Sequence, residues 1–323
     1  MTAAAISSAA PARGMRAIDP RRDLGGLGSV IEAAFAERLD PEGKRMVQAM
    51  RSFGRWGRLG WAIGRWFLPP AAFPQGYVWL EEGRIVGNAS LMRVDEAPRR
   101  WVLINVAVEP TWRRRGIGSS LVRACLDEAR RRGAHEVFLQ VDASEAGAQE
   151  LYARLGFRVV SHRTTWNRIA GWSPPAETAQ EPARARRSAD SLEHLALVRR
   201  LHPEGLLWPR PLDSAGVLDG VWARHWVWPE EGPLMASLSA FPGYEAPGVH
   251  WLMVLDPLAR GRAEAALLDR ALHASPGRGT MRLEVDHAAD ESSLRAHGFQ
   301  PGRSLKWMAL TLGLRSAVEP TAR

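Results

Sequence analysis

The sequence predicts an α/β fold, with two tandem domains that each contain a mixed β-sheet flanked by helices. Three observations support this prediction. The chain has 323 residues, a length that suits two domains at roughly 100–200 residues each. Strand-like and helix-like segments alternate along the first half, as they do in folds that layer helices on a sheet. A similar order of segments recurs in the second half, which indicates a duplicated unit.

The first unit is expected to begin with a strand, two helices and a hairpin. Asp23 is placed to cap the first helix, and the Glu81-Glu82-Gly83 segment is typical of a hairpin turn between two strands. In chain order, these elements are expected at 16–18, 23–38, 44–67, 77–80 and 84–94.

A buried strand and two helix–strand pairs are expected to follow. The strand is a nearly continuous apolar run that Pro110 ends. Gly133 and Gly156 stand just past the two helices, where a left-handed residue commonly ends a helix. The first helix has one apolar face, made of Ile117, Leu121, Val122, Cys125, Leu126 and Ala129. The elements are expected at 101–108, 116–132, 136–141, 146–155 and 157–166.

Matched landmarks indicate a tandem duplication of a unit of roughly 150 residues. The distance between matched positions drifts only from 149 (Gly83 to Gly232) to 141 (Trp166 to Trp307), and the matches stay collinear. The segment between the units is rich in Pro, Ala, Glu and Arg, a composition typical of a linker. The predicted organisation is a tail (1–14), a first domain (15–170), a linker (171–188), a second domain (189–315) and a tail (316–323).

Composition excludes several classes of protein. Hydrophobic residues at 46% and charged residues at 24% exclude a wholly disordered chain. Cys125 is the single cysteine, so no intramolecular disulfide forms, which favours a reducing, cytoplasmic location. Residues 1–13 lack the apolar core of a secretory signal. Residues 61–73 form an apolar stretch that is too short and too interrupted to span a bilayer.

The charge of the chain is unevenly distributed. The net charge is +8, and 41 of the 43 basic residues are arginine because Lys44 and Lys306 are the only lysines. Residues 1–170 carry 26 basic and 17 acidic side chains, a net charge of +9, whereas 189–323 carry 14 and 16, a net charge of −2. This asymmetry is consistent with an acidic ligand in the first half, or with dispersed surface arginines.

The segment 104–119 carries the clearest functional signal: a buried strand, an Arg/Gly loop and the start of a helix. Free N–H groups and the macrodipole at a helix N-terminus favour anions, and Gly116 and Gly118 allow a ligand to approach the backbone. Arg113, Arg114 and Arg115 add positive charge. The segment lacks the Gly-Lys-Ser/Thr of a Walker A loop and the third glycine of a dinucleotide fingerprint. It therefore predicts a pyrophosphate site of another kind.

This segment resembles motif A of the GNAT acyl-CoA-dependent N-acetyltransferases, in which Arg/Gln-x-x-Gly-x-Gly/Ala is filled here by Arg113, Gly116 and Gly118. The resemblance covers about 15–166 and includes the Leu-Tyr-x-x-x-Gly-Phe segment at 151–157. Within the family, the first domain is most similar to the bacterial ribosomal-protein alanine acetyltransferases. The resemblance implies two GNAT-like domains with mostly antiparallel sheets. It also implies transfer of an acetyl group from acetyl-CoA to an amine, either a small molecule or a protein N-terminus or side chain, by direct attack in a ternary complex.

The resemblance also assigns roles to individual residues. The backbone of Val106, Ala107 and Val108 would hold the acetyl-thioester, and Tyr152 matches the family's general acid. The chemistry requires such a group because the leaving thiolate, with a thiol pKa of about 8.5, needs a proton that a phenol can supply. The alternative for Tyr152 is a half-buried helix aromatic. The pyrophosphate would lie on Arg113, Arg114, Arg115, Gly116, Ile117, Gly118 and Ser119.

The position of the general base departs from the family pattern. Gln140 stands where the ribosomal-protein enzymes have a glutamate, and a glutamine does not accept a proton. Asp142, on the same strand face, and Glu145, where the family usually has an asparagine, are the candidates. The third possibility is that no side chain acts as the base. The nine histidines show no metal-ligand spacing, so no metal is predicted.

The second unit has lost the motif. Arg260, Ala263 and Ala265 match Arg113, Gly116 and Gly118, and each alanine adds a methyl group where a phosphate would approach the backbone. Leu294 matches Tyr152. The second domain is therefore expected to be a non-catalytic copy.

Apolar and aromatic residues stand at helical spacing among arginines between Arg51 and Phe67. This stretch is interpreted as a hydrophobic wall of the acceptor cleft, with a basic amphipathic helix that touches a membrane or nucleic acid as the alternative. The residues are Phe53, Trp56, Gly60, Ile63 and Phe67.

The leading functional hypothesis is an acetyl-CoA-dependent N-acetyltransferase with an active first domain. The alternatives are a catalytically silent CoA-binding or interaction protein, which Gln140 favours, and an arginine-rich nucleic-acid-binding module. No recognised nucleic-acid motif is present, so no nucleic-acid partner is expected.

Overall fold

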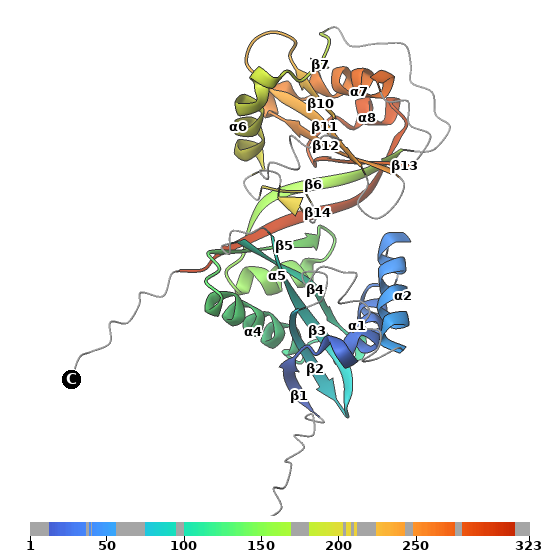
Figure 1. Cartoon of the computed structure of the whole chain (residues 1–323), viewed down its shortest axis with the longest axis vertical. Helices are drawn as coiled ribbons and strands as arrows, with labels where there is room; N and C mark the ends of the chain where they lie inside the picture. Colours follow the sequence, from blue (N-terminus) through green and yellow to red (C-terminus); the bar gives the residue numbers. More distant parts are fainter. Residues whose placement is uncertain are drawn as a thin grey trace, which may run out of the picture. The chain divides into compact units, whose positions relative to one another are not determined.

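The computed structural model (Figure 1) describes two compact units, Met1–Leu139 with Leu310–Arg323, and Gln140–Ala309. Each unit contains a mixed sheet with helices, which confirms the predicted fold class. These two units follow the contacts within the fold, and their borders differ from those of the predicted repeats. The domain borders given above therefore stay predictions. The residues described are 13–36, 39, 41–55, 75–94, 100–168, 181–202, 205–207, 210–211, 224–242, 248–274 and 280–313.

The sheet of the first unit is antiparallel except for its last pair. Its strands lie in the order β1 (Gly14–Ala17), β2 (Gln75–Glu81), β3 (Arg84–Arg93), β4 (Arg100–Val108) and β5 (Glu136–Asp142). The β4–β5 pair is parallel. A parallel connection requires a crossover, and helix α4 (Ile117–Arg131) supplies it.

Helices cover both faces of this sheet (Figure 1). On one face, α1 (Pro20–Phe35) buries Leu27, Val30 and Ile31 against β2 and β3. Helix α2 (Pro41–Arg55) packs on α1. On the other face, α4 buries the apolar residues that the sequence predicts, Cys125 among them. Gly87 of β3 permits this contact, because a Cβ there would lie 2.9 Å from Ile117 Cγ2.

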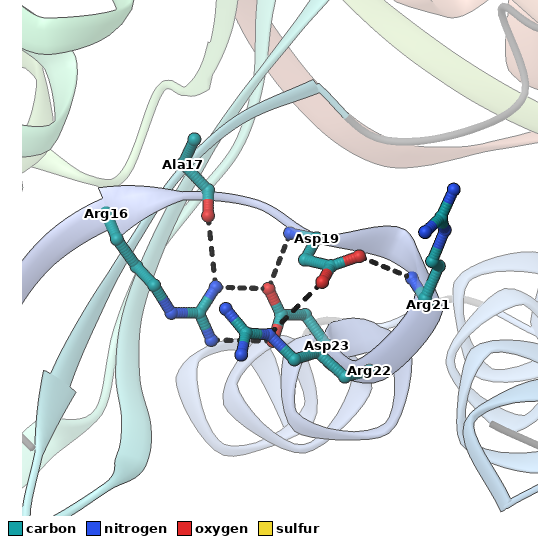
Figure 2. Close-up of polar contacts among 6 residues, drawn as sticks. All are labelled: Arg16, Ala17, Asp19, Arg21, Arg22 and Asp23. Atoms are coloured by element: carbon teal, nitrogen blue, oxygen red, sulfur yellow. Dashed lines mark hydrogen bonds and ion pairs between the residues drawn. The ribbon is translucent and has the colours of Figure 1, made fainter. Parts of the chain in front are cut away.

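The start of α1 differs from the sequence prediction. Asp19, not Asp23, is the N-cap: its carboxylate accepts a hydrogen bond from Arg21 N at 3.1 Å, and Pro20 occupies the first helical position. Figure 2 shows Asp23 inside the helix, where it accepts two hydrogen bonds from the Arg16 guanidinium at 2.6 and 2.7 Å. Asp23 Oδ2 also accepts from Asp19 N at 2.7 Å. The buried Asp23 therefore joins β1 to α1.

Substitution of Asp23 by alanine is expected to destabilise the protein by about 3 kcal/mol, because it leaves the largely buried Arg16 guanidinium without its carboxylate. Urea denaturation measures the change in the free energy of unfolding. The matched control is Asp19→Ala, which removes a helix cap and an exposed ion pair with Arg22 and is expected to cost about 1 kcal/mol. An Asp23→Ala cost no larger than that of Asp19→Ala would contradict this account.

The other predicted elements of the first half are confirmed to within two residues where the structure describes them, except at two helix ends. Helix α1 ends at Phe35 and not at Arg38, and α2 begins at Pro41, three residues before its predicted start. Helix α2 is described up to Arg55. The rest of the predicted 44–67 helix, the side chain of Phe53 and the proposed acceptor wall from Trp56 to Phe67 lie outside the described residues. So do 1–12, 314–323 and most of the predicted linker. None of the helices that the structure describes has the length and apolar character needed to cross a membrane.

The sheet of the second unit is antiparallel apart from its β12–β13 pair. Its strand order is β14 (Phe299–Thr311), β6 (Arg158–Arg168), β13 (Thr280–Asp286), β12 (Gly248–Leu255), β11 (Ala236–Pro242), β10 (Arg224–Trp228) and β7 (Arg184–Ala185). Strands β8 (Leu206–Leu207) and β9 (Arg210–Pro211) form a separate pair.

Alternation along the strands builds two cores in this unit. Trp251 and Met253 of β12 face the core formed with α7 (Ala263–Ala274) and α8 (Glu291–Ala296). Leu252 and Val254 face the opposite core, formed with α6 (Ser191–Leu201). This two-residue period is the one a strand covered on both faces requires. The unit also contains α5 (Ala146–Arg154), which precedes β6.

The two predicted repeats exchange strands within this unit. Strand β6 belongs to the first repeat, yet it pairs with β13 on one side and with β14 on the other, both from the second repeat. No local signal in the sequence predicts this interleaving.

Candidate active site

Strand β4 contains an irregularity where the thioester was predicted to bind. Asn105 has a φ of 51°, and the register with β3 shifts between Asn88 and Ser90. The buried Asn88 fixes the bulge by donating to Asn105 O at 2.8 Å. The parallel ladder with β5 runs only to Leu103, whereas β4 continues to Val108. The backbone of Val106–Val108 therefore lies past the bulge and beyond that ladder. On the β5 side, its N–H and C=O groups are free of ladder pairing, as the binding of a ligand there requires.

The loop after β4 ends in two left-handed residues. Arg114 has a φ of 64° and Gly116 has a φ of 79°, and α4 begins at Ile117. Glycine suits position 116 because of this φ, since a Cβ there would meet no atom within 4 Å. Among the described residues, no side chain caps this helix. The N–H groups of its first turn thus lack the side-chain acceptor that a Ser, Thr or Asp cap would supply, which suits an anionic ligand.

The three arginines of the loop have different surroundings. Arg113 donates to Val108 O at 3.0 Å and to Ala34 O at 3.1 Å, so it braces the loop against β4 and the end of α1. The Arg115 guanidinium lies 4.5 Å from the centre of the Trp112 ring. Arg114 is exposed. In the part of the chain that the structure describes, none of the three forms an ion pair with a carboxylate, so their charge remains available to an anion.

The matching loop of the second repeat is already filled by carboxylates. Gly261, at the position of Arg114, is also left-handed with a φ of 77°, but its N–H donates to Glu264 Oε2 at 2.8 Å. Glu264 is buried, and burial raises the pKa of its carboxyl group. Arg260 pairs with Asp286 at 3.0 Å and Arg262 pairs with Glu181 at 2.9 Å. In the second loop, carboxylates therefore already take the Gly261 N–H and pair with both arginines. The sequence shows that Ala263 and Ala265 replace the two glycines, but it does not predict this role of Glu264.

Tyr152 lies on α5 and is buried, 6% exposed. Its ring packs edge-to-face on Phe157, with centroids 5.9 Å apart. The helix ends in a Schellman motif: Gly156 has a φ of 93°, its N–H donates to Ala153 O, and Phe157 N donates to Tyr152 O, both at 3.0 Å. This motif requires glycine at position 156, which explains the Gly-Phe pair of the sequence. It also places Phe157 where its ring packs on that of Tyr152. Burial raises the pKa of the Tyr152 phenol, so the phenol stays protonated, as a general acid must.

The candidate bases lie in the turn between β5 and α5. Asp142 accepts hydrogen bonds from Ser144 N at 3.0 Å and from Ser144 Oγ at 2.7 Å, and Arg303 lies 3.5 Å away. Burial raises the pKa of Asp142, but these hydrogen bonds and Arg303 outweigh it and leave the pKa below its usual value. Glu145 is the N-cap residue of α5, and its N–H donates to Asp142 O at 3.0 Å. Both residues therefore have a structural role in forming the turn. Their role as bases stays a prediction.

The predicted site residues divide between the two units. The segment 106–119 belongs to the first unit, and Tyr152, Asp142 and Glu145 come together on one turn and helix of the second. Within the described chain, no group of three or more His, Cys, Asp or Glu side chains is arranged to hold a metal. The expectation that no metal is used stays a prediction.

Comparisons with known proteins identify the family. The model of the acetyltransferase (GNAT) family matches residues 44–157. N-alpha-acetyltransferase RimI of Mycobacterium tuberculosis is 33% identical over 112 residues, which cover 32% of this chain and 69% of the relative. The chain belongs to the GNAT family. The GNAT match contains every site residue predicted from the sequence and ends before the second repeat.

One further sequence relative and one solved structure are similar to this GNAT protein. The [ribosomal protein bS18]-alanine N-acetyltransferase of Escherichia coli is 38% identical over 73 residues, 23% of this chain. This chain spans about half (47%) of that relative's length. A GCN5-related N-acetyltransferase structure from Sphaerobacter thermophilus is 18% identical, with a TM-score of 0.58, and covers 92% of this chain and 95% of its own. The last likeness shows that the fold of the whole chain, second repeat included, occurs in another GNAT protein.

Proposed function

We propose that this chain is an acetyl-CoA-dependent N-acetyltransferase whose cosubstrate site lies in the first repeat. The contrast between the two matching loops carries the proposal. In the first loop, the helix N-terminus and the arginines have no carboxylate partner among the described residues, whereas Glu264, Asp286 and Glu181 fill the second. A pyrophosphate needs the first arrangement.

The chain's residues have separate tasks in the proposed reaction. The backbone of Val106–Val108 holds the thioester, and the loop to Ser119 binds the pyrophosphate. The acceptor amine attacks the thioester carbon in a ternary complex, so a C–N bond forms and the C–S bond breaks. Tyr152 gives its proton to the leaving thiolate, while the amine loses a proton to water or to a base. The phenolate then takes up a proton from solvent, which restores the phenol for the next turnover.

The acceptor is proposed to be an amine of a small molecule or of a protein. The Escherichia coli relative is named for the alanine of ribosomal protein bS18. Gln140 replaces the glutamate of that group of enzymes here, which favours a different acceptor. We place the reaction in the cytoplasm, since the chain has a single cysteine that is buried in the core.

A thiol-release assay over a panel of small amines and N-terminal peptides tests this proposal. Release of CoA that depends on the amine is expected with at least one acceptor class, and a peptide with N-terminal alanine belongs in the panel. Acetyl-CoA binding with no thiol release from any acceptor would favour the silent CoA-binding protein instead. That alternative is supported by Gln140 and by the lowered pKa of Asp142.

The affinity for acetyl-CoA is expected to fall as salt rises. The proposed contact pairs exposed Arg114 and Arg115, together with backbone dipoles, with a polyanion, and salt screens such exposed charges. Titration calorimetry at low and high ionic strength measures the change. An affinity that stays constant would mean that these arginines do not face the phosphates.

A further inference from the structure

The turn between β5 and α5 is held by strand β14 of the second repeat. Ala143 N donates to Ser304 O at 2.9 Å, and the Arg303 guanidinium lies 3.5 Å from Asp142 Oδ2. These contacts join residues that are about 160 positions apart in the chain. The turn that begins the Tyr152 helix is therefore built partly by the other repeat.

Gln149 ties the same turn from inside α5. Its Nε2 donates to Asp142 O at 3.1 Å and to Ala143 O at 2.9 Å. Its Oε1 accepts a hydrogen bond from Lys306 Nζ at 2.7 Å. An ammonium group only donates, so Lys306 selects the amide oxygen and leaves the amide NH₂ for the two carbonyls of the turn. Lys306 thus fixes the orientation of the amide that closes the turn.

Composition gives a second, independent reason to single out Lys306. Only two of the 43 basic residues are lysines, so the arginine bias of the chain does not explain a lysine at this half-buried position. A compact ammonium on a flexible stem suits a single acceptor, whereas a planar guanidinium suits two.

A pair of stacked histidines lies next to Lys306. Its strand partner is His162, whose Nε2 lies 2.9 Å from Ser304 Oγ and whose ring stacks on His287 at 4.0 Å. Burial lowers the pKa of His162, and His287 and Lys306 lower it further, so the His162 ring is neutral at pH 7. Asp286, which also faces the cluster, acts in the opposite direction.

We propose that Lys306 is a positioning residue for the acetyl-transfer reaction: through Gln149 it fixes the turn that begins α5, and α5 carries Tyr152. This inference rests on the proposed function. It gives the second repeat a task in the first repeat's chemistry, although its own loop is filled by carboxylates.

The test is a double-mutant cycle on the full chain with Lys306→Met and Gln149→Ala. Each single variant is expected to lower kcat by up to about 100-fold at saturating acceptor, because small misplacements of catalytic groups have costs of this size. Acetyl-CoA affinity is expected to stay within about twofold of the wild type, since neither side chain belongs to the loop at 113–119. The double variant is expected to lose no more than either single variant, because both changes break one chain of contacts. Gln300→Met, an exposed change on the same strand, serves as the control and is expected to leave kcat unchanged.

Amide hydrogen exchange over 143–155 gives a readout that does not depend on turnover. Lys306→Met is expected to accelerate exchange there and to leave 117–131 unchanged. Additive losses of kcat, or exchange at 143–155 equal to that of an active wild type, would overturn the inference while leaving the proposed function intact. A wild type that releases no thiol with any acceptor would overturn the proposed function and, with it, the positioning role of Lys306.

Discussion

Phenylalanine in place of Tyr152 is expected to lower the rate of the chemical step by about 10²–10⁴-fold, the usual contribution of a general acid. Acetyl-CoA affinity should change little, because the ring that packs on Phe157 remains. The fold should also survive, since the Schellman motif depends on backbone groups and on Gly156. Single-turnover measurements with any accepted amine separate chemistry from product release.

The pH dependence of the wild type provides an internal check on this assignment. Burial raises the pKa of the Tyr152 phenol, so its acidic form persists above the ordinary phenol pKa of about 10. The rate should therefore not decline at pH 10 through ionisation of Tyr152. Tyr77→Phe is the matched control, because it removes a phenol that accepts from Arg131 Nη2 at 3.0 Å and is not among the proposed site residues. Full activity of Tyr152→Phe, or a loss of thermal stability alone, would identify Tyr152 as a core aromatic.

Glutamate in place of Gly118 is expected to abolish acetyl-CoA binding. The change puts a side chain and a negative charge at the second residue of α4, where the proposed pyrophosphate lies. The variant should still fold, because an acidic residue in the first turn favours the helix dipole and glutamate has a higher helix propensity than glycine. Loss of binding is thus separable from loss of structure by circular dichroism.

Ala265→Glu makes the same change at the matching position of the second repeat. It is expected to leave acetyl-CoA affinity unchanged, since the second loop is occupied by its own carboxylates. Equal losses of affinity in the two variants would contradict the assignment of the site to the first loop.

Local sequence signals predicted most of the secondary structure. Gly83, Gly133 and Gly156 all have a positive φ at the turns where they were expected, and α4 buries the face that its periodicity predicts. The error at Asp23 arose from two acidic residues four positions apart, of which Pro20 favours Asp19 as the cap. Such signals depend on residues that are close in sequence. The structure confirms them where these residues determine the local conformation.

Long-range features could not be predicted in this way. The pairing of β6 with β14 and the bond between Lys306 and Gln149, 157 residues apart, depend on which strands become neighbours. No turn or periodicity in a single sequence encodes that choice. Glu264 was missed for a related reason: its helical position fits a solvated residue, and only the folded loop turns its carboxylate onto Gly261 N.

The number of acetyl-CoA molecules bound per chain tests the central claim most directly. Titration calorimetry of the wild-type chain is predicted to give one site, because one loop offers its helix N-terminus and arginines to phosphate. In the other loop, Glu264 accepts from Gly261 N, and Asp286 and Glu181 pair with the arginines. Two equal sites, or one site that survives Gly118→Glu, would contradict the account.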